Sequence, residues 1–425
     1  MRSIGEIGLN ANYRQSLLQA LALALLCVVT YACSLDNGFI SDDYTNIESA
    51  AKIGWRSVLG TAPENFRLTS YLAYAWLERV FDGRYVLFYA ANITLHFFNC
   101  LLLWKVLLLL GRPDKEAYLA AALFAVFQAP QEAVMWIAAM NETLLAFFGL
   151  STLVLWLKSR FYLSTVVFLL ALFSKESALI LLLVLILIRY ERRQQILTLD
   201  LVPLVVPVLV FGSVFFWTWS RNSMIQHNLY DFSPRAGLVV ARSLHLLFRP
   251  SFYLLFPALM LTRKEWRLFR ALPKFVFWIV VPMLPYIFLL YSPYVPSRQV
   301  YLASMVVTSV MAFLLCEIPH RTIQSGLVSL LIVYNVAYTW IRNDQQFENR
   351  AAPTTQLLAL IKSHQPVPVL IERFPYAHSG IAKAVSRYAP GWSRDDIHVN
   401  EDAESCHECV IFSWDAESKT YVGHW

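Results

Sequence analysis

Long apolar runs separated by short polar segments dominate the chain. A helix that crosses the roughly 30 Å hydrocarbon core of a bilayer needs about 20 mainly apolar residues. The runs predict eleven transmembrane helices, some of them short, at about 17–34, 86–109, 117–130, 138–157, 161–174, 177–190, 200–219, 246–262, 274–291, 300–316 and 325–341. The pairs at 117–157 and 161–190 could also contain a re-entrant segment.

Two stretches depart from this pattern. Within a long loop at 35–85, residues 67–81 (RLTSYLAYAWLERVF) gather leucines and aromatic residues on one helical face, which predicts a helix lying flat in the membrane interface. The tail at 342–425 mixes helical spacing with the strand-like segments PVPVLIE, IHV, CVIFSW and KTYVG. We therefore expect a membrane domain over 1–341 and a small soluble α/β domain over 342–425, which could form its own core or dock on the outer loops.

Composition supports an all-α polytopic membrane protein. The 425 residues are 57% hydrophobic and only 15% charged, whereas soluble proteins carry nearer a quarter charged residues. The net charge of +6 needs no nucleic acid as partner, since Lys and Arg are expected on cytoplasmic loops and near anionic lipid head groups. No convincing cleavage site precedes or follows the first apolar run, so we expect it to be retained as a helix.

The distribution of charge predicts an orientation. With the N-terminus in the cytoplasm, the clustered basic segments RYERR and TRKEWRLFR fall on cytoplasmic loops. The opposite loops carry dispersed cations among acids and aromatic residues. We therefore expect a multi-pass protein of the plasma (inner) membrane, with a working surface and the C-terminal domain on the extracytoplasmic side.

Acidic residues at helix ends are the first candidates for chemistry. Asp42 and Asp43 follow the first apolar run, where they are either solvated surface or a general base and metal ligand. Neighbours on an extended chain point to opposite sides, so the two are not expected to share one role. Glu132 and Glu142 in QAPQEAVMWIAAMNE lie among apolar residues, where an acid is costly unless it is paired or functional.

Basic residues on the same predicted side form a second set. They could be paired or snorkelling interfacial side chains, or they could bind a lipid phosphate, for which the planar arginine fork is suited. Lys175 stands beside Glu176 in FSKESA; Arg242, His245 and Arg249 share one helical face; and Arg298 and Tyr301 start the tenth helix.

Two further motifs have a plain structural interpretation. Asn92, His96 and Asn99 lie on one face of the second helix, where hydrogen bonding between helices is favoured over a histidine that reaches the outer cavity. Cys406–Cys409 (CHEC) is favoured as a local disulfide or free thiols over a zinc site, because no second such motif supplies ligands.

Taken in order, these pieces resemble the GT-C glycosyltransferases, in particular the protein O-mannosyltransferase-like branch and its tetratricopeptide-bearing relatives. The resemblance rests on FISDDYTNI, on the segment RLTSYLAYAWLERVFDGRYVLFYAANITLHFFNCLLL with Arg67, on PQEAVMWIAAMNETLLAFF, on FSKESALILLLVLIL and on SRQVYLAS. This chain has Pro130 and Gln131 where relatives often carry His-Thr, and Gln299 and Val300 where they often carry Arg-Tyr. It has no tetratricopeptide repeats.

The resemblance implies a hexosyl- or pentosyltransferase that uses a polyprenyl-phosphate sugar outside the cytoplasm, with a glycan, lipid or protein as acceptor. Asp42 matches the general base, while Asp43 and Glu132 match acids that organise the site or a divalent metal such as Mg²⁺ or Mn²⁺. We expect inversion, since retention usually needs two displacements. The expected donor-phosphate residues are Lys175, Arg298, Arg242 and Arg67, and the expected cavity-lining residues are His96, His245, Tyr301 and Glu142.

Two other classes of function fit a polytopic chain. A transporter or lipid flippase also places charges within helices, but such proteins tend to show internal repeats and Gly- or Pro-broken helices. Gly is scarce here, with 14 in 425 residues, and the two halves show no correspondence. A non-catalytic assembly subunit, with the tail as its interaction module, is the other alternative.

Overall fold

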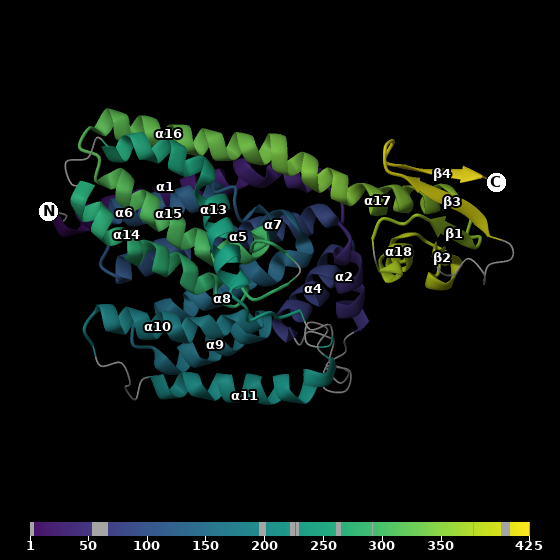
Figure 1. Cartoon of the computed structure of the whole chain (residues 1–425), viewed down its shortest axis with the longest axis horizontal. Coiled ribbons are helices and arrows are strands. Elements are labelled where there is room, and N and C mark those ends of the chain that lie inside the picture. The colour runs from purple at the N-terminus through teal and green to yellow at the C-terminus, as the bar shows by residue number, and fades with distance from the viewer. Residues whose placement is uncertain are drawn as a thin grey trace.

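The computed structural model describes residues 4–52, 67–194, 201–221, 226, 229–260, 265–290, 292–376, 378–400 and 409–424. Long helices packed side by side form its larger body, and a small sheet lies beyond one end of that body (Figure 1). The helices of the larger body are α1 (Ile4–Tyr31), α2 (Asp42–Lys52), α4 (Leu68–Phe81), α5 (Tyr85–Leu109), α6 (Asp114–Val126), α7 (Gln131–Met135), α8 (Met140–Leu157), α9 (Phe161–Ser174), α10 (Ile180–Glu191), α11 (Val202–Thr218), α13 (Arg235–Met260), α14 (Glu265–Val280), α15 (Tyr301–Cys316) and α16 (Arg321–Tyr338).

Several helices have the length and composition that a bilayer requires. Among the described residues, five segments are long and apolar enough to cross a membrane: Arg14–Asp36, Tyr85–Leu109, Ile137–Leu157, Ser297–Cys316 and Arg321–Ser363. Three shorter apolar helices cover Phe161–Ser174, Val202–Trp217 and Ala271–Met283. These helices are compatible with a membrane protein.

The expected number of eleven transmembrane helices is wrong. Each of the eleven predicted segments contains helix, but α6, α9 and α10 have only 13, 14 and 12 residues. At 1.5 Å per residue they are about 18–21 Å long, well short of a hydrocarbon core of about 30 Å. Lys175 has an extended backbone (φ −163°, ψ 138°) and separates α9 from α10. Apolar composition thus predicted where the helices lie along the chain, but it did not predict where each helix ends.

Helix α4 has the amphipathic character expected of residues 67–81. Leu72, Trp76 and Val80 recur every four residues and are 52%, 62% and 53% exposed, so they form an apolar stripe on the outside. Tyr74 and Leu77 on the other face are buried. An exposed apolar stripe over a buried face suits a helix lying in the membrane interface.

The C-terminal segment has the small α/β fold that the sequence predicts. Strands β1 (Val369–Glu372), β2 (Ile397–Val399), β3 (Val410–Asp415) and β4 (Thr420–His424) form a sheet in the order β2-β1-β3-β4. Strand β1 pairs in parallel with β2 and β3, and β4 is antiparallel to β3. Helix α18 (Ser379–Val385) connects β1 towards β2.

No loop separates this unit from the last membrane helix. Helix α16 continues through one π-helical turn, Thr339–Asn343, into α17 (Asp344–Ser363), which reaches the sheet (Figure 1). The predicted boundary at 342 therefore falls inside a continuous helical segment.

The C-terminal unit docks on the loop at 35–85, and docking on the loops is one of the two arrangements left open by the sequence. A single apolar core joins Phe39, Tyr44 and Leu77 of the loop to Leu357 and Ile371 of the C-terminal unit. Polar contacts surround that core: Thr354 Oγ1 donates to the Phe39 carbonyl at 3.1 Å, Arg387 Nε lies 3.3 Å from Glu78 Oε1, and Arg394 pairs with Glu48.

Gly83 offers a test of this docking. Its φ is +71°, and a Cβ atom there would lie 2.5 Å from the Tyr388 ring. Gly111 has a similar φ of +84° but nothing within 4 Å of its Cβ position. We expect Gly111→Ala to cost about 1–2 kcal/mol for the left-handed backbone alone, and Gly83→Ala to cost about 1–3 kcal/mol more because the ring must move. Thermal unfolding in detergent measures both, and equal shifts in Tm would show that the Tyr388 contact does not matter.

Candidate active site

The two adjacent aspartates at the start of α2 have different surroundings. Asp43 is fully buried, and its carboxylate accepts the backbone N–H of Ile40 at 2.8 Å and of Ala138 at 2.6 Å. Asp43 thereby connects the loop at 35–85 to Ala138, in the segment that precedes α8. Asp42 is half-buried, and the Ser41 hydroxyl donates to it at 3.1 Å. Asp42 is thus the acid with the more available carboxylate, and Asp43 fixes the loop that carries it.

The buried position of Asp43 changes its acidity. Burial raises the pKa of the Asp43 carboxyl to about 8, although its two backbone hydrogen bonds and the charge of Arg350 oppose the rise. A carboxyl pKa raised on folding means that the folded chain binds this proton more tightly than the unfolded chain. Its contribution to stability is therefore full below the ordinary carboxyl range and is lost as the pH rises through about 8.

We expect this titration to be visible in Asp43→Asn. The Tm of the wild type should fall, relative to the variant, as the pH rises from about 5 to about 9, because only the wild type must lose the buried proton. Thermal unfolding in one detergent at several pH values measures the difference. A difference that stays constant over this range would contradict the raised pKa.

Trp136 is the centre of a cluster that contains Arg298 and Arg350, which we call the Trp136 cluster. The guanidinium carbon of Arg298 lies 4.7 Å from its ring centroid, and that of Arg350 lies 4.3 Å away. Its indole N–H donates to the Ile40 carbonyl at 3.3 Å, so the ring is held against the aspartate loop. Arginine over an aromatic face is a favourable cation–π arrangement, and here one ring holds two cations.

Glu132 connects the same two arginines. Its Oε1 accepts from Arg350 Nη1 at 2.9 Å, and its Oε2 accepts the backbone N–H of Arg298 at 3.3 Å. Ser297 Oγ donates to the Ala129 carbonyl at 2.6 Å and so fixes the start of the 3₁₀ turn Ser297–Val300. Glu132 is therefore a neutralising and positioning group for Arg350.

Tyr376 brings the C-terminal unit to the aspartates. Its hydroxyl donates to the Arg350 carbonyl. Burial raises the pKa of Tyr376 to about 12; the charges of Asp42 and Asp43 add to the rise, and Arg350 opposes it. The charges of both aspartates and of Arg350 thus act on the Tyr376 hydroxyl.

Arg350 and Tyr376 were missed by the sequence analysis. Both lie in the segment assigned to a separate soluble domain, where one arginine in the polar helix NDQQFENRAAP looks like a solvated surface residue. No signal in the sequence distinguishes Arg350, because its partners Glu132 and Trp136 lie more than 200 positions away.

Two cations expected at a donor phosphate are instead paired with acids. Arg67 makes two hydrogen bonds to Glu176, at 2.8 and 3.1 Å. Lys175 pairs with Glu142; both are buried, and Glu142 also accepts from the Tyr286 hydroxyl at 3.2 Å. Arg298 differs from them: within the part of the chain that the structure describes, its guanidinium has no carboxylate partner.

The remaining predicted cavity residues lie elsewhere. His96 and Tyr301 are fully buried and hydrogen-bonded to each other, with 2.6 Å between Nδ1 and the hydroxyl oxygen. Asn99 also donates to that hydroxyl at 3.1 Å, which is the hydrogen bonding between helices that the spacing favours. Arg242 and His245 are exposed on α13 and make no contact with the cluster around Trp136 among the described residues.

A hard divalent cation does not fit Asp43 and Glu132 as they are arranged. Mg²⁺ and Mn²⁺ need available carboxylate oxygens. Both oxygens of Asp43 accept backbone N–H groups, and both oxygens of Glu132 accept from the two arginine residues. A dication here would also lie beside the Arg350 guanidinium, which already pairs with Glu132, and like charges repel.

No protein-family model and no curated protein matches this chain. The resemblance to the GT-C enzymes therefore stays an expectation from the sequence motifs alone. What the structure adds is that the loop carrying Asp43, the 130–136 segment and Arg298, which are far apart in the sequence, lie together.

A cavity of about 600 Å³ lies where the loop at 35–85 meets the C-terminal unit, and its lining includes neither the two aspartates nor the residues around Trp136. Phe39 and Tyr44, which flank the two aspartates in the sequence, form part of its wall. The volume is typical of sites for small ligands. Its other lining residues are Gly38, Asp82, Gly83, Arg84, Tyr85, Val86, Leu87, Thr355, Leu358, Lys362 and Tyr388.

One cysteine of the CHEC motif is described by the structure. Cys409 is disulfide-bonded, whereas Cys406 lies outside the described residues. Disulfides persist mainly in oxidising compartments, so this bond is evidence for the side of the membrane on which the C-terminal unit lies.

Proposed function

We propose that this chain is a membrane glycosyltransferase that moves a hexosyl or pentosyl group from a polyprenyl-phosphate donor to an acceptor hydroxyl. The observation that carries the proposal is that Arg298, which lacks a carboxylate partner among the described residues, packs on Trp136, whose indole N–H donates to the Ile40 carbonyl in the loop that carries Asp42. A general base and a phosphate-binding cation are the two groups that this transfer needs.

Asp42 acts as the base in a single displacement. Its carboxylate takes the proton from the acceptor hydroxyl as the hydroxyl oxygen attacks the anomeric carbon of the donor. The bond from that carbon to the phosphate oxygen breaks, and its electron pair leaves with the phosphate. One displacement from the opposite face inverts the anomeric centre. The acceptor is a glycan, a lipid or a protein.

Arg298 stabilises the leaving phosphate. A lipid phosphate is already a fair leaving group, so electrostatic stabilisation of its developing charge is sufficient. The planar guanidinium can make two hydrogen bonds to phosphate oxygens. Arg350 and Glu132 hold Trp136 and the Arg298 turn in place. In this proposal Lys175 and Arg67 do not bind the donor phosphate, because each is neutralised by its own acid.

The site is proposed to face the extracytoplasmic side of the plasma (inner) membrane. The disulfide at Cys409 supports this placement, since the C-terminal unit that contains it also contributes Arg350 and Tyr376 to the cluster. The lipid tail of the donor would remain in the bilayer beside the apolar helices.

A transfer assay tests the proposal. Purified chain in lipid vesicles is given polyprenyl-phosphate hexoses and pentoses with glycan, lipid and peptide acceptors. We expect transfer, and we expect Arg298→Ala to lower kcat/KM for the donor by about 10²–10³-fold through loss of a charge-assisted contact in the transition state. Arg160→Ala is the matched control, because it removes an exposed arginine beyond the far end of the 18-residue helix α8, about 27 Å along that helix from the segment after Trp136, and should leave transfer unchanged.

The alternatives have different outcomes in the same assay. Movement of the intact donor lipid across the bilayer without transfer would favour a flippase, to which the buried Lys175–Glu142 pair would also be suited. Neither transfer nor movement with any donor would favour a non-catalytic subunit. Transfer that Arg298→Ala leaves unchanged would remove Arg298 from the donor site.

A further inference from the structure

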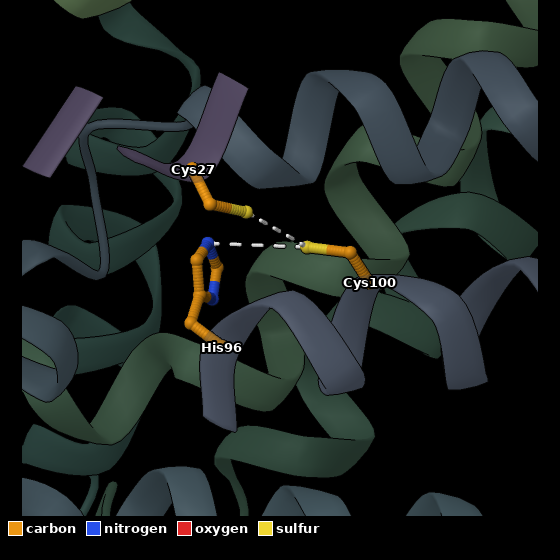
Figure 2. A group of neighbouring side chains, drawn as sticks. All are labelled: Cys27, His96 and Cys100. Atoms are coloured by element: carbon orange, nitrogen blue, oxygen red, sulfur yellow. Dashed lines mark hydrogen bonds between the residues drawn. The ribbon is translucent and has the colours of Figure 1, made fainter. Parts of the chain in front are cut away.

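A group of soft metal ligands lies in the interior of the helical body, away from the cluster around Trp136. Figure 2 shows Cys27 of α1 pointing towards His96 and Cys100 of α5. All three residues have no exposed surface. His96 and Cys100 are four residues apart, so they share one face of α5. The three ligand atoms lie within 4.8 Å of one another.

We propose that Cys27, His96 and Cys100 bind one Zn²⁺ ion as a structural site. Zn–S bonds of about 2.3 Å and Zn–N bonds of about 2.0–2.1 Å place the ligands of a tetrahedral ion about 3.5–3.8 Å apart. The Ala125 carbonyl, 3.4 Å from His96 Nε2, lies beside the three side chains as a fourth ligand. The Cys27 and Cys100 sulfurs are 4.0 Å apart, and Cys100 Sγ is 4.0 Å from His96 Nε2. The ligands therefore need to move only slightly to enclose the ion.

The second nitrogen of the imidazole is already held in place. His96 Nδ1 lies 2.6 Å from the Tyr301 hydroxyl, which Asn99 fixes from the other side at 3.1 Å. A hydrogen bond at one ring nitrogen orients the other towards a metal, as is usual for metal-binding histidines. In the zinc form Nδ1 carries the ring proton and donates it to Tyr301. His96 Nε2 then gives up its contact with the Ala125 carbonyl, 3.4 Å away, and its lone pair binds the ion.

Charge selects Zn²⁺ over a monovalent soft ion. The interior of the cluster is walled by the rings of Tyr31, Phe124 and Tyr301, which lie 5.0–5.7 Å from the His96 ring. A net charge in such surroundings is costly. One dication that replaces the two thiol protons leaves the cluster neutral, whereas Cu⁺ with two thiolates would leave one negative charge. The released protons pass to solvent as the chain folds around the ion.

The site would join the first helix to the body. Much of α1 is exposed along its outer face, where Leu18, Leu21 and Leu25 are 57–63% exposed. A zinc ion between Cys27 and α5 would hold this helix beside its neighbour. Without an ion, the same three residues are a small packing cluster with weak S–H hydrogen bonds, which is the ordinary role of buried cysteines.

Metal analysis of the purified full chain decides between these two states. Because the cluster is fully buried, the ion must enter during folding, so the chain is expressed with zinc in the medium and analysed as purified. We expect about one zinc ion per folded chain, and less than about a tenth of that in Cys27→Ser and Cys100→Ser. Cys316→Ser removes a cysteine outside the cluster and should retain the metal.

If the serine variants fail to fold, the zinc content of the wild type alone tests the proposal. Folded, monodisperse wild type with less than about a tenth of an equivalent of zinc would overturn it, as would copper in place of zinc. Full zinc content in a folded double variant Cys27→Ser/Cys100→Ser would also overturn it. Expression with Co²⁺ gives a second measurement, since a thiolate-to-cobalt absorption band that Cys316→Ser retains supports the site.

Discussion

Asp42→Asn is expected to lower sugar transfer by about 10²–10⁴-fold, the usual contribution of a positioned general base. The amide keeps the shape of the side chain but cannot take the acceptor proton. Asp42 is half-buried, and among the described residues its carboxylate accepts one hydrogen bond, from the Ser41 hydroxyl. The variant should therefore fold normally and bind donor with little change, and the loss should appear in kcat. Single-turnover transfer with a saturating lipid-phosphate sugar measures it.

Asp36→Asn is the matched control for this experiment. Asp36 lies six positions earlier at the end of the 3₁₀ turn Ala32–Asp36, is exposed, and makes no contact with the Trp136 cluster among the described residues. The same chemical change there should leave transfer unaltered. An Asp42→Asn variant with full transfer would remove Asp42 from the mechanism even if the chain proves to be a transferase.

Lys175→Met is expected to destabilise the chain by about 3–5 kcal/mol, the typical cost of breaking a buried ion pair from one side. Lys175 and Glu142 are only 4% and 2% exposed. Removing the ammonium leaves a buried carboxylate whose remaining hydrogen bond among the described residues comes from the Tyr286 hydroxyl at 3.2 Å. The ammonium also lies 4.8 Å from the Tyr286 ring, a cation–π contact that the variant loses. Thermal unfolding in detergent or bicelles measures the loss.

The double variant Lys175→Met/Glu142→Leu separates charge from packing. Replacing both partners of a buried pair by apolar groups is often neutral or stabilising, so most of the lost stability should return. Lys158→Met, at an exposed lysine of the next loop, should change Tm little. A double variant as unstable as Lys175→Met would mean that shape, and not the unpaired charge, causes the loss.

Local pattern predicted much of the fold. Each apolar run contains helix, and the strand-like segments PVPVLIE, IHV, CVIFSW and KTYVG correspond to β1, β2, β3 and β4. Periodicity and side-chain type carry this information because they act over a few residues. The lengths of α6, α9 and α10 depended on where packing and backbone breaks end each helix, which hydropathy does not report.

The candidate site was predictable only in part. The sequence indicated Asp42, Glu132 and Arg298 as candidates, but not that Asp43 is fixed by the Ala138 N–H or that Arg67 is paired with Glu176. Such pairings join residues about 100 positions apart, and no local pattern encodes them. Arg350 was missed for the same reason.

The uninterrupted run from α16 through the π turn into α17 limits how this protein can be divided. Cutting at 342, where the composition changes, would remove Arg350 and Tyr376. It would also expose Phe39 and Tyr44, which are buried against the C-terminal unit. The shortened chain would keep every candidate membrane span except the end of the last one, yet its site would be incomplete. The C-terminal unit is thus a structural component of the site and not a detachable accessory.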